Sequence, residues 1–286
     1  MNGNLIDILQ KQMCSFSKSH KRLATYIVNN YDKAAFMTAS RLGQAVNVSE
    51  STVIRFAGML GYDGYPELQD ALLKTAHNKM TVGQRLQVTK NRIGSSDVLA
   101  GVLQADMDKI RLTLEKTDSF MFDKVIDCIL RAEHIYIMGV RSSSALAEFL
   151  GFYLNLMFDN VKTVGTSGVT ELYEQVLHIK KEDVIICISY PRYSNRTIKA
   201  MRFAGLRGAN VIAITDDKTS PLCACANYSL FAKSDMTSFV DSLVAPLSLI
   251  NAIIAAIAIK KENDLTNVLQ ELEDIWDENQ VYDEES

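Results

Sequence analysis

The chain is short of the residues that crosslink small secreted proteins and of the long apolar runs that cross membranes. Its five cysteines are an odd number without framework spacing, which indicates free thiols in a reducing compartment. The longest apolar candidate, residues 243–259, is interrupted by Pro246, Ser248 and Asn251 and does not reach the ~18 apolar residues of a membrane span. The first residues lack the charged-then-apolar pattern of a signal peptide. We therefore expect a cytoplasmic protein that makes no membrane contact.

Metal-ligand patterns are scarce as well. Cys223 and Cys225 lie too close together for a zinc site, and no histidine lies near them. We therefore expect neither a metal nor another cofactor. With 286 residues, 48% of them hydrophobic and 22% charged, the composition is that of a globular protein with room for two domains.

An excess of basic residues is also missing, because the formal net charge is −4. The charge is unevenly distributed, however. Residues 1–77 carry eight Lys and Arg against six Asp and Glu, whereas residues 261–286 carry ten acidic residues and one lysine. The mildly basic first part is compatible with phosphate contacts, and the acidic end is typical of a solvated, partly frayed terminus.

Residues 38–65 have the spacing of two short helices joined by a tight turn. The second helix, expected at 49–60, can be capped by the Ser49 hydroxyl and ended by Gly61. Its apolar face repeats at i, i+3, i+4 and i+7, with Val53, Phe56, Ala57 and Leu60. The first helix, expected at 38–45, has a shorter apolar face that consists of Leu42, Ala45 and Val46. The turn follows at Asn47 and Val48.

The start of the second helix carries small polar residues and an arginine that point away from this apolar face. In a helix-turn-helix, the second helix places its N-terminal residues in the major groove of DNA. We therefore predict contacts to operator DNA from this helix and from Lys21, which begins an earlier basic helical segment; the residues are Ser49, Ser51, Thr52, Arg55 and Lys21. An ordinary helical hairpin has the same spacing, so spacing alone leaves both interpretations open.

Helical periodicity in the first 77 residues predicts five helices, at about 4–13, 17–30, 38–45, 49–60 and 65–76. From residue 135 the pattern changes to strands alternating with helices. Short apolar runs at 135–139, 161–164, 184–188, 210–215 and 228–231 predict buried strands. Helices are expected at 96–117, 118–131, 143–157, 169–178, 195–207, 220–226 and 238–260. The expected fold class is α/β, with a parallel sheet in a three-layer sandwich that follows an all-α helix-turn-helix domain. The expected divisions are a DNA-binding domain at 1–77, a linker at 78–95, a ligand-binding and dimerisation domain at 96–262 and an acidic tail at 263–286.

Two loops that each join a strand to a helix have the composition of an anion site. The loop 139–144 and the loop 189–197 combine hydroxyls, arginines and the free N–H groups of a helix start. A third element, residues 165–168, could close over them. Serine often caps a helix without any ligand, but two such loops at one edge of a sheet favour a small anionic ligand. The candidate contacts are Gly139, Arg141, Ser142, Ser143, Ser189, Arg192, Ser194 and Thr197.

Taken together, these features resemble the RpiR family of bacterial transcription regulators, which join a helix-turn-helix head to a sugar isomerase (SIS) domain. The resemblance covers about residues 1–260. In the head it rests on Leu42, Ala45, Val48, Ser49, Thr52, Val53, Arg55, Phe56, Leu60, Gly61, Gly64, Tyr65 and Leu68. In the second part it rests on residues 139–143, 189–197, 208–209, 215–216 and 220–222.

Both ligand loops depart from the family pattern. The first is usually Gly-x-Gly-x-Ser, and Arg141 replaces its second glycine; the second is usually Ser-x-Ser-Gly-x-Ser/Thr, which residues 190–193 break. The resemblance implies a phosphosugar ligand, with Ser142, Ser143, Ser189 and Ser194 as contacts by position. The arginines at 141 and 192 are our addition from chemistry, because a guanidinium also suits a carboxylate such as that of a sugar acid.

The expected function is therefore that of a transcriptional regulator whose SIS domain senses a small anionic sugar derivative and alters operator binding. We expect a homo-oligomer, either a dimer or a tetramer, that uses the long helix at 238–260. A dimer would place two heads on half-sites ~34 Å or a multiple apart.

Two alternatives stay open. A sugar-phosphate isomerase would need a general base, for which Glu148, Glu171 and His178 are the nearest candidates. An enzyme has no need of a helix that reads DNA, so we expect no catalytic activity. The second alternative is a DNA-binding scaffold whose SIS-like domain only dimerises and has lost its ligand.

Overall fold

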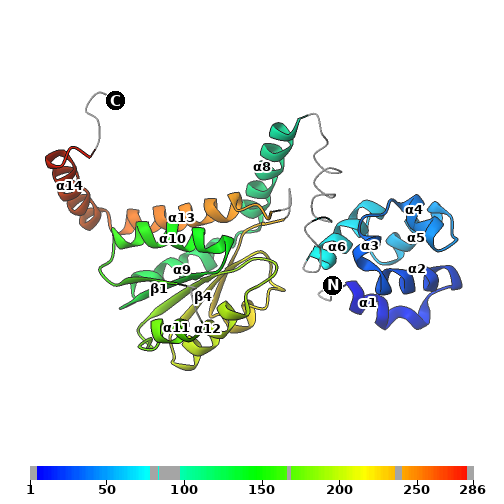
Figure 1. Ribbon diagram of the computed structural model, residues 1–286, viewed down its shortest axis with the longest axis horizontal. Coiled ribbons are helices and arrows are strands. Elements are labelled where there is room, and N and C mark those ends of the chain that lie inside the picture. The colour runs from blue at the N-terminus through cyan, green and yellow to red at the C-terminus, as the bar shows by residue number, and fades with distance from the viewer. Residues whose placement is uncertain (1–4, 78–82, 84–96, 166–168, 236–239, 282–286) are drawn as a thin grey trace. The chain divides into compact units, whose positions relative to one another are not determined.

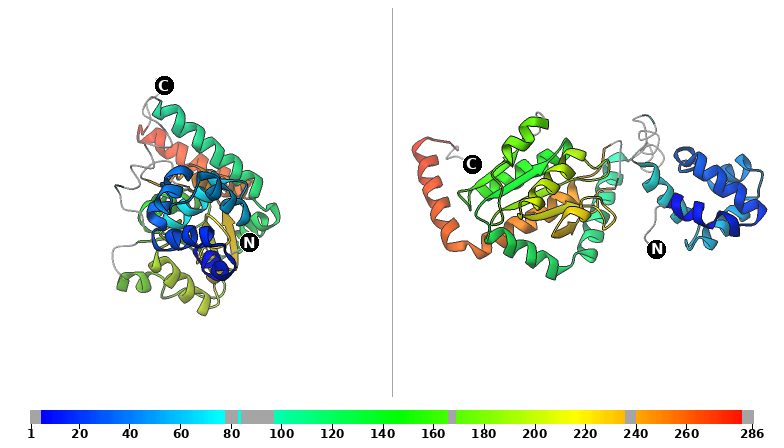
Figure 2. Two further views of the ribbon diagram at one scale, coloured as in Figure 1. Left: turned by 90° about the vertical axis from the view of Figure 1, so that its right-hand side faces the viewer. Right: turned by 90° about the horizontal axis from the view of Figure 1, so that it is seen from below.

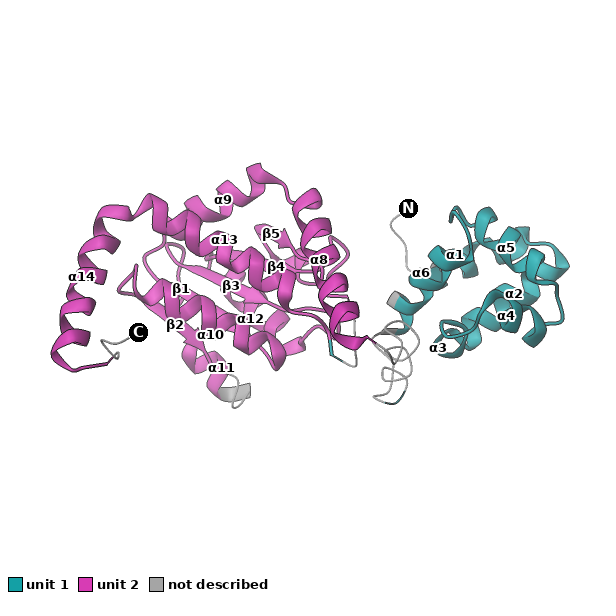
Figure 3. Ribbon diagram, turned by 90° about the horizontal axis from the view of Figure 1, so that it is seen from above, with its two compact units in different colours: residues 1–96, 238–240 teal, residues 97–237, 241–286 magenta. Residues whose placement is uncertain are grey.

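The computed structural model describes residues 5–77, 83, 97–165, 169–235 and 240–281. The chain divides into two compact units, residues 1–96 with 238–240 and residues 97–237 with 241–286 (Figure 3). We call the described residues 5–77 the helical head and the described residues 97–235 and 241–281 the α/β domain. The expected linker, 78–95, lies outside the described residues apart from Gly83.

The helical head contains the five helices that periodicity predicts and one short helix that it does not. Their bounds are α1 Leu5–Gln12, α2 Lys18–Asn29, α3 Tyr31–Ala34, α4 Ala39–Ala45, α5 Glu50–Met59 and α6 Tyr65–His77, with a 3-10 turn at Met13–Ser15. The missed helix, α3, spans only four residues, too few to show a repeat. Large apolar side chains from several of these helices meet in one core, including Leu23, Ile27, Leu42, Phe56 and Leu68.

The turn between α4 and α5 is closed by local hydrogen bonds at both ends. Helix α4 ends in a Schellman motif, in which Val48 N–H donates to the Gly43 carbonyl at 2.9 Å and Asn47 takes a positive φ of 52°. Ser49 then caps α5 by accepting from Thr52 N–H at 3.3 Å, as the sequence predicts. Asparagine tolerates the left-handed conformation, so this turn is made of residues that suit it.

The inner face of α4 differs from the expected one in one position. Ala45 is exposed, whereas Gly43 is buried beside the turn. A Cβ atom on Gly43 would lie 2.7 Å from the Val48 carbonyl oxygen, so the close approach of the turn requires glycine there. Leu42 and Val46 are buried as expected.

The α/β domain is built on a five-stranded parallel sheet with the order β2-β1-β3-β4-β5. The strands are β1 Ile135–Gly139, β2 Val161–Val164, β3 Val184–Ile188, β4 Asn210–Thr215 and β5 Tyr228–Phe231, at the positions that the apolar runs predict. Every residue of β1 and β3 is buried, which explains their continuous apolar sequence. The chain reverses its direction of winding between β1 and β3, the two neighbouring strands at the centre.

Helices cover both faces of this sheet (Figures 1 and 2). Side chains of α9 Ser119–Leu130, α10 Ser142–Asn155 and α13 Val244–Lys260 form the core on one face. Side chains of α11 Val169–Gln175 and α12 Asn195–Leu206 form the core on the other face. Helix α8, Val98–Lys116, packs against α13.

Three helices expected in the α/β domain differ from the structure. Residues 220–226 form only a 3-10 turn at Cys223–Cys225, because the N–H groups of Cys223 and Cys225 bond to carbonyls three residues earlier. The long helix expected at 238–260 begins at Val244 instead, after a connection in which Ser234 Oγ donates to the Ser242 carbonyl. Helix α11 ends at Gln175 rather than at 178.

The acidic end of the chain was expected to be a solvated, partly frayed terminus; residues 262–278 have no buried member, as expected, but they are helical rather than frayed. They form helix α14, Glu262–Glu278, which lies at 99° to α13. Apolar residues recur at helical spacing along it, and Leu265 packs against the core next to α13. In the described residues no single helix is long and apolar enough to cross a membrane, and α13 and α14 satisfy that test only as a bent pair.

Candidate functional site

The first turns of α5 carry the residues predicted to contact DNA. Ser49, Ser51 and Arg55 are exposed and Thr52 is half-buried. The Ser49 hydroxyl lies 2.9 Å from the Ser51 hydroxyl and 2.8 Å from that of Thr52. Arg55 Nε donates to the Ser51 carbonyl at 3.3 Å, which holds the guanidinium beside these hydroxyls. The structure therefore brings four of the five predicted residues into one polar surface, whereas Lys21 lies exposed on α2.

Two neighbours of Lys21 that could also face phosphates have structural contacts instead. Arg22 donates from its guanidinium to the carbonyls of Val46 and Asn47 at the end of α4. The His20 ring lies 5.3 Å from the Phe56 ring, centroid to centroid. Arg22 thus caps the carbonyl end of α4, a role that sequence spacing did not indicate because the two segments are 24 residues apart.

In the α/β domain, both predicted ligand loops leave the two strands at the reversal of winding. Gly139, the last residue of β1, is the register partner of Ile188, the last residue of β3. Neighbouring strands lie ~4.8 Å apart, so the loops that follow begin side by side. A sheet of this order binds ligands in the crevice outside the carboxyl ends of these two strands. The topology therefore places the loops 139–144 and 189–197 at the expected crevice.

The first loop is a tight turn in which Ser143 N–H donates to the Val140 carbonyl at 3.3 Å. Arg141 occupies the second position with φ 60° and ψ −125°, a conformation that favours glycine and costs about 1–3 kcal/mol for other residues. Ser144 Oγ donates to the Arg141 carbonyl at 2.7 Å, and Ser143 is buried. Arg141 and Ser142 are exposed at the start of α10.

Gly139 belongs to this loop for a steric reason. A Cβ atom there would lie 2.0 Å from the Ser143 carbonyl oxygen, so only glycine lets α10 begin this close to β1. Its predicted role as a ligand contact is not tested by this packing.

The second loop is held by a chain of hydrogen bonds between backbone and hydroxyls. Ser194 N–H donates to the buried Ser189 hydroxyl at 3.2 Å, and Ser194 Oγ accepts from Thr197 N–H at 3.4 Å as the cap of α12. Arg192 has a positive φ of 68° and is exposed. Pro191 and Arg192 occupy the part of the loop where the family pattern has serine and glycine.

Two buried hydroxyls at this edge have no hydrogen-bond partner among the described residues. They are Tyr190 Oη and Thr197 Oγ1, on residues that are 6% and 0% exposed. A buried polar group without a partner is costly, and such groups often mark the place of a ligand. Thr197 is a predicted ligand contact, whereas Tyr190 is not, because its place next to a proline gave no sign that its hydroxyl is buried.

A carboxylate network borders the second loop at the end of β4. Tyr193 Oη donates to Asp216 Oδ1 at 2.9 Å, and Thr215 Oγ1 lies 3.1 Å from the same oxygen. Burial raises the pKa of the Asp216 carboxyl above its usual value, and the Tyr193 hydroxyl bond opposes this shift. Burial, together with the nearby Asp216 charge, also raises the pKa of Tyr193. The Tyr193 hydrogen bond therefore ties the second loop to the end of β4. The resemblance to the family includes Asp216 but indicates no role for it.

The residues considered as a general base lie on the surface. Glu148 is exposed on α10, one turn beyond the first loop, and Glu171 is exposed on α11. His178 is exposed in the segment that follows α11. Of the third element, Gly165 donates its N–H to Gln175 Oε1 at 2.7 Å, and residues 166–168 lie outside the described residues.

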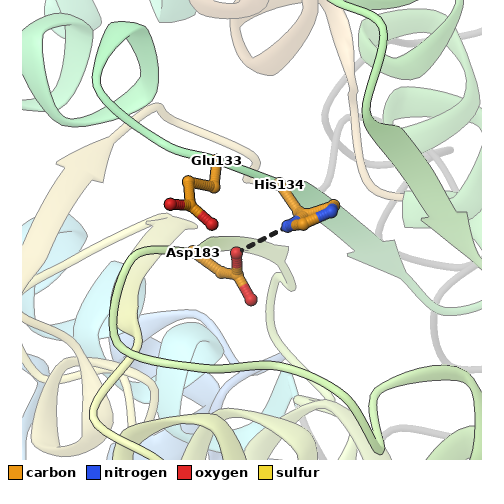
Figure 4. A group of neighbouring side chains, drawn as sticks. All are labelled: Glu133, His134 and Asp183. Atoms are coloured by element: carbon orange, nitrogen blue, oxygen red, sulfur yellow. Dashed lines mark hydrogen bonds and ion pairs between the residues drawn. The ribbon is translucent and has the colours of Figure 1, made fainter.

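A separate polar cluster lies at the opposite, amino-terminal edge of the sheet (Figure 4). His134 Nδ1 lies 2.9 Å from Asp183 Oδ1, and these residues directly precede β1 and β3. The buried Asp183 also accepts from Lys180 N–H at 2.8 Å, and the Lys180 ammonium lies 2.6 Å from Glu133 Oε2. The ammonium offsets one of the two carboxylate charges, and His134 and the Lys180 N–H bond to Asp183 between the starts of β1 and β3, so we assign the cluster a structural role in aligning the two strands.

A helix-turn-helix head followed by a doubly wound sheet is an architecture of ligand-responsive DNA-binding proteins, and one edge of this sheet has groups that suit an anion. Comparison with known proteins then gives the family. Residues 3–79 match the model of the helix-turn-helix domain of the rpiR family, and residues 128–256 match the model of the SIS domain. The chain therefore combines a helix-turn-helix domain of the rpiR family with a SIS domain.

Relatives and solved structures agree with this assignment. The chain is 25% identical over 280 residues to an uncharacterized HTH-type transcriptional regulator of Caldanaerobacter subterraneus subsp. tengcongensis, covering 95% of this chain and 96% of that one. It is similar to the sugar isomerase domain of an RpiR transcription factor from Sphaerobacter thermophilus, with 27% identity, a TM-score of 0.60, and coverage of 62% of this chain and 99% of that one.

A second solved structure matches almost the whole chain. It is the Vibrio vulnificus NanR protein complexed with ManNAc-6P, with 20% identity, a TM-score of 0.59, and coverage of 96% of this chain and 98% of that one. This likeness extends the agreement in fold over both the helical head and the α/β domain.

Proposed function

We propose that this protein is a transcriptional regulator that binds operator DNA through α5 and senses an anionic sugar metabolite at the edge of its SIS sheet. One observation carries the proposal above the others. The two loops with hydroxyls, arginines and helix starts leave the two neighbouring strands where the winding reverses, in a chain that also has an exposed polar helix start in its head. The regulated process would take place in the cytoplasm.

The DNA contact is supported by the surface at the start of α5. Three hydroxyls and the Arg55 guanidinium lie together there, held by hydrogen bonds among themselves. Hydroxyls and guanidinium groups are common partners of base edges and phosphates. Lys21, exposed on α2, adds a charge that suits the DNA backbone.

The effector is proposed to be a phosphosugar or a related sugar anion. The exposed starts of α10 and α12 offer free N–H groups, and Arg141 and Arg192 offer guanidinium groups that bind phosphate or carboxylate through two parallel hydrogen bonds. The NanR protein of similar fold was solved in complex with ManNAc-6P. The fold also occurs in isomerases, but the named relatives of this chain are regulators, so we propose no catalytic activity.

The regulator is proposed to be a homo-oligomer. The expected contact helix, now α13, is mainly a core helix, because six of its residues are buried in its own domain. A different helix, α8, presents an apolar stripe at helical spacing, and contiguous exposed apolar patches often mark protein–protein contacts. Its members are Leu99, Leu103, Met107, Ile110 and Leu114, all more than a third exposed.

The test combines DNA selection with one substitution. A duplex selected from a random pool by the wild-type protein is titrated by fluorescence anisotropy at fixed salt, and light scattering gives the oligomeric state. Arg55→Ala should weaken binding about fivefold or more, because the loss of one guanidinium contact costs about 1–3 kcal/mol. Lys124→Ala, an exposed lysine on α9 of the α/β domain, is the control and should leave the affinity unchanged.

Two outcomes would count against the proposal. If selection yields no preferred DNA sequence, the head does not bind DNA sequence-specifically. If Arg55→Ala binds the selected duplex as tightly as the wild type, Arg55 does not belong to the contact surface.

A further inference from the structure

We call the loops 139–144 and 189–197, which follow β1 and β3, the effector edge. Two arginines in these loops occupy backbone conformations that favour glycine. Arg141 lies at the second position of a tight turn with φ 60° and ψ −125°. Arg192 follows Pro191 with φ 68°, in the left-handed region that favours glycine. Only four residues other than glycine have a positive φ in the described chain, and two of them are these arginines. A glycine would adopt either conformation without strain, so the side chains themselves need an explanation.

Each arginine accompanies its own helix start. Arg141 directly precedes α10, and Arg192 lies three residues before the first residue of α12. Each loop also brings a hydroxyl: Ser142 is exposed at the first turn of α10, and Ser194 caps α12. The edge therefore contains two complete sets of anion-binding groups, where one phosphate needs only one set.

Buried hydroxyls without a partner supply a second line of evidence at this edge. Thr197 Oγ1 lies in the first turn of α12, and the residue is 0% exposed. Tyr190 packs in the core on the α10 face, and its Oη is likewise without a partner among the described residues. Both hydroxyls belong to the loop 189–197, so the buried groups without a partner among the described residues lie in the second of the two loops.

We infer that the effector carries two separate anionic groups, one held at each helix start. This inference rests on the proposed function and narrows it from phosphosugars in general to sugars with a phosphate and a second anion. The strands that lead to the two loops are neighbours, so a short sugar chain can span from one set to the other. The second anion is a carboxylate, as in a phosphorylated sugar acid, or a second phosphate, as in a sugar bisphosphate; both offer the oxygen pair that a guanidinium binds.

The experiment compares four probes on the full-length protein by isothermal titration calorimetry. They are 6-phosphogluconate, fructose 1,6-bisphosphate, glucose 6-phosphate and gluconate. We expect at least one of the first two to bind about tenfold or more tightly than glucose 6-phosphate, since a charge-assisted hydrogen bond to a second anion adds that much. Which of the two binds distinguishes a carboxylate from a second phosphate.

Two variants test the arginines without a risk of unfolding. Arg141→Gly and Arg192→Gly remove the charge and also relieve the backbone, so the unliganded melting temperature should equal or exceed that of the wild type. Each should lose the preference for the probe with two anions, while its affinity for glucose 6-phosphate changes less. Arg202→Ala, an exposed arginine further along α12, is the control and should keep the preference.

The outcomes separate the inference from the function on which it rests. If glucose 6-phosphate binds as tightly as both probes with two anions, or if the glycine variants keep the preference, the inference is wrong and a phosphosugar sensor remains. If none of the phosphorylated probes binds the wild-type protein, both the inference and the proposed sensing of phosphosugars fail.

Discussion

In both the helical head and the effector edge, a tight turn with a residue of positive φ leads into a helix, but the residues at these turns differ. In the head, Asn47 takes the left-handed position and Ser49 caps the next helix, so each residue suits its local conformation. At the effector edge, arginines occupy conformations that favour glycine, and two buried hydroxyls have no partner among the described residues. Local conflicts of this kind are concentrated at functional sites in natural proteins.

The comparison separates residues that maintain the fold from residues that we propose to serve a ligand. The turn in the head can be explained entirely by its own hydrogen bonds and packing. At the effector edge, a glycine in place of Arg141 or Arg192 would adopt the same backbone angles with less strain. We therefore interpret the head turn as a rigid support for its exposed face and the effector loops as the place where binding chemistry outweighs stability.

The largest loss of stability is expected at a glycine that has no room for a Cβ atom, a restriction found in both regions. Gly139→Ala should destabilise the α/β domain by about 3 kcal/mol, because the added Cβ would lie 2.0 Å from the Ser143 carbonyl oxygen. Chemical denaturation measures this change. Gly205→Ala on α12 is the matched control, since its Cβ would make only an ordinary contact at 3.9 Å, and it should be neutral or stabilising. A cost below about 1 kcal/mol for Gly139→Ala would mean that α10 can shift freely.

A smaller loss is expected in the head. Gly43→Ala would bring a Cβ to 2.7 Å from the Val48 carbonyl oxygen and should destabilise the turn by about 1–3 kcal/mol. Hydrogen exchange measured by mass spectrometry should show faster exchange in α4 and α5. Gly58→Ala on α5 is the control, because its Cβ would meet nothing within 4 Å and should add helix propensity. Equal exchange in Gly43→Ala and the wild type would contradict the tight packing of this turn.

The smallest expected change in stability compares the two regions directly at positions of positive φ. Asn47→Gly and Arg141→Gly place the same residue at two positions of positive φ. Asparagine tolerates its position, so Asn47→Gly should change the free energy of unfolding by only a few tenths of a kcal/mol. Arg141→Gly should stabilise the unliganded protein by about 1 kcal/mol or more. If both variants change stability equally, Arg141 is not strained and the contrast disappears.

Much of this structure follows from periodicity and spacing in the sequence. Buried parallel strands leave continuous apolar runs, so all five strands are found where the runs predict them, and Ser49 and Gly61 mark the ends of α5. Secondary structure was predicted less well in two segments. In residues 220–226, short-range hydrogen bonds form a 3-10 turn in place of the expected helix. In α14, the many acidic residues drew attention away from apolar residues at helical spacing, which favour a helix there.

The site was predictable in its composition but not in its geometry. Alternation of strands and helices indicates that the loops 139–144 and 189–197 lie at one edge, and the strand order then makes them neighbours. The buried hydroxyl of Tyr190, the strain at Arg141 and the capping role of Arg22 depend on backbone angles and on contacts between distant segments. No spacing rule in one sequence reports such features.

The central claim, that a sugar anion at the sheet edge alters DNA binding, is tested most directly by one titration. The affinity for the selected duplex is measured by fluorescence anisotropy with and without a phosphosugar that thermal shift shows to be bound at saturation. A regulator should change its dissociation constant by about fivefold or more in either direction, the usual range of coupling between two sites. An unchanged dissociation constant with the ligand fully bound would contradict the account.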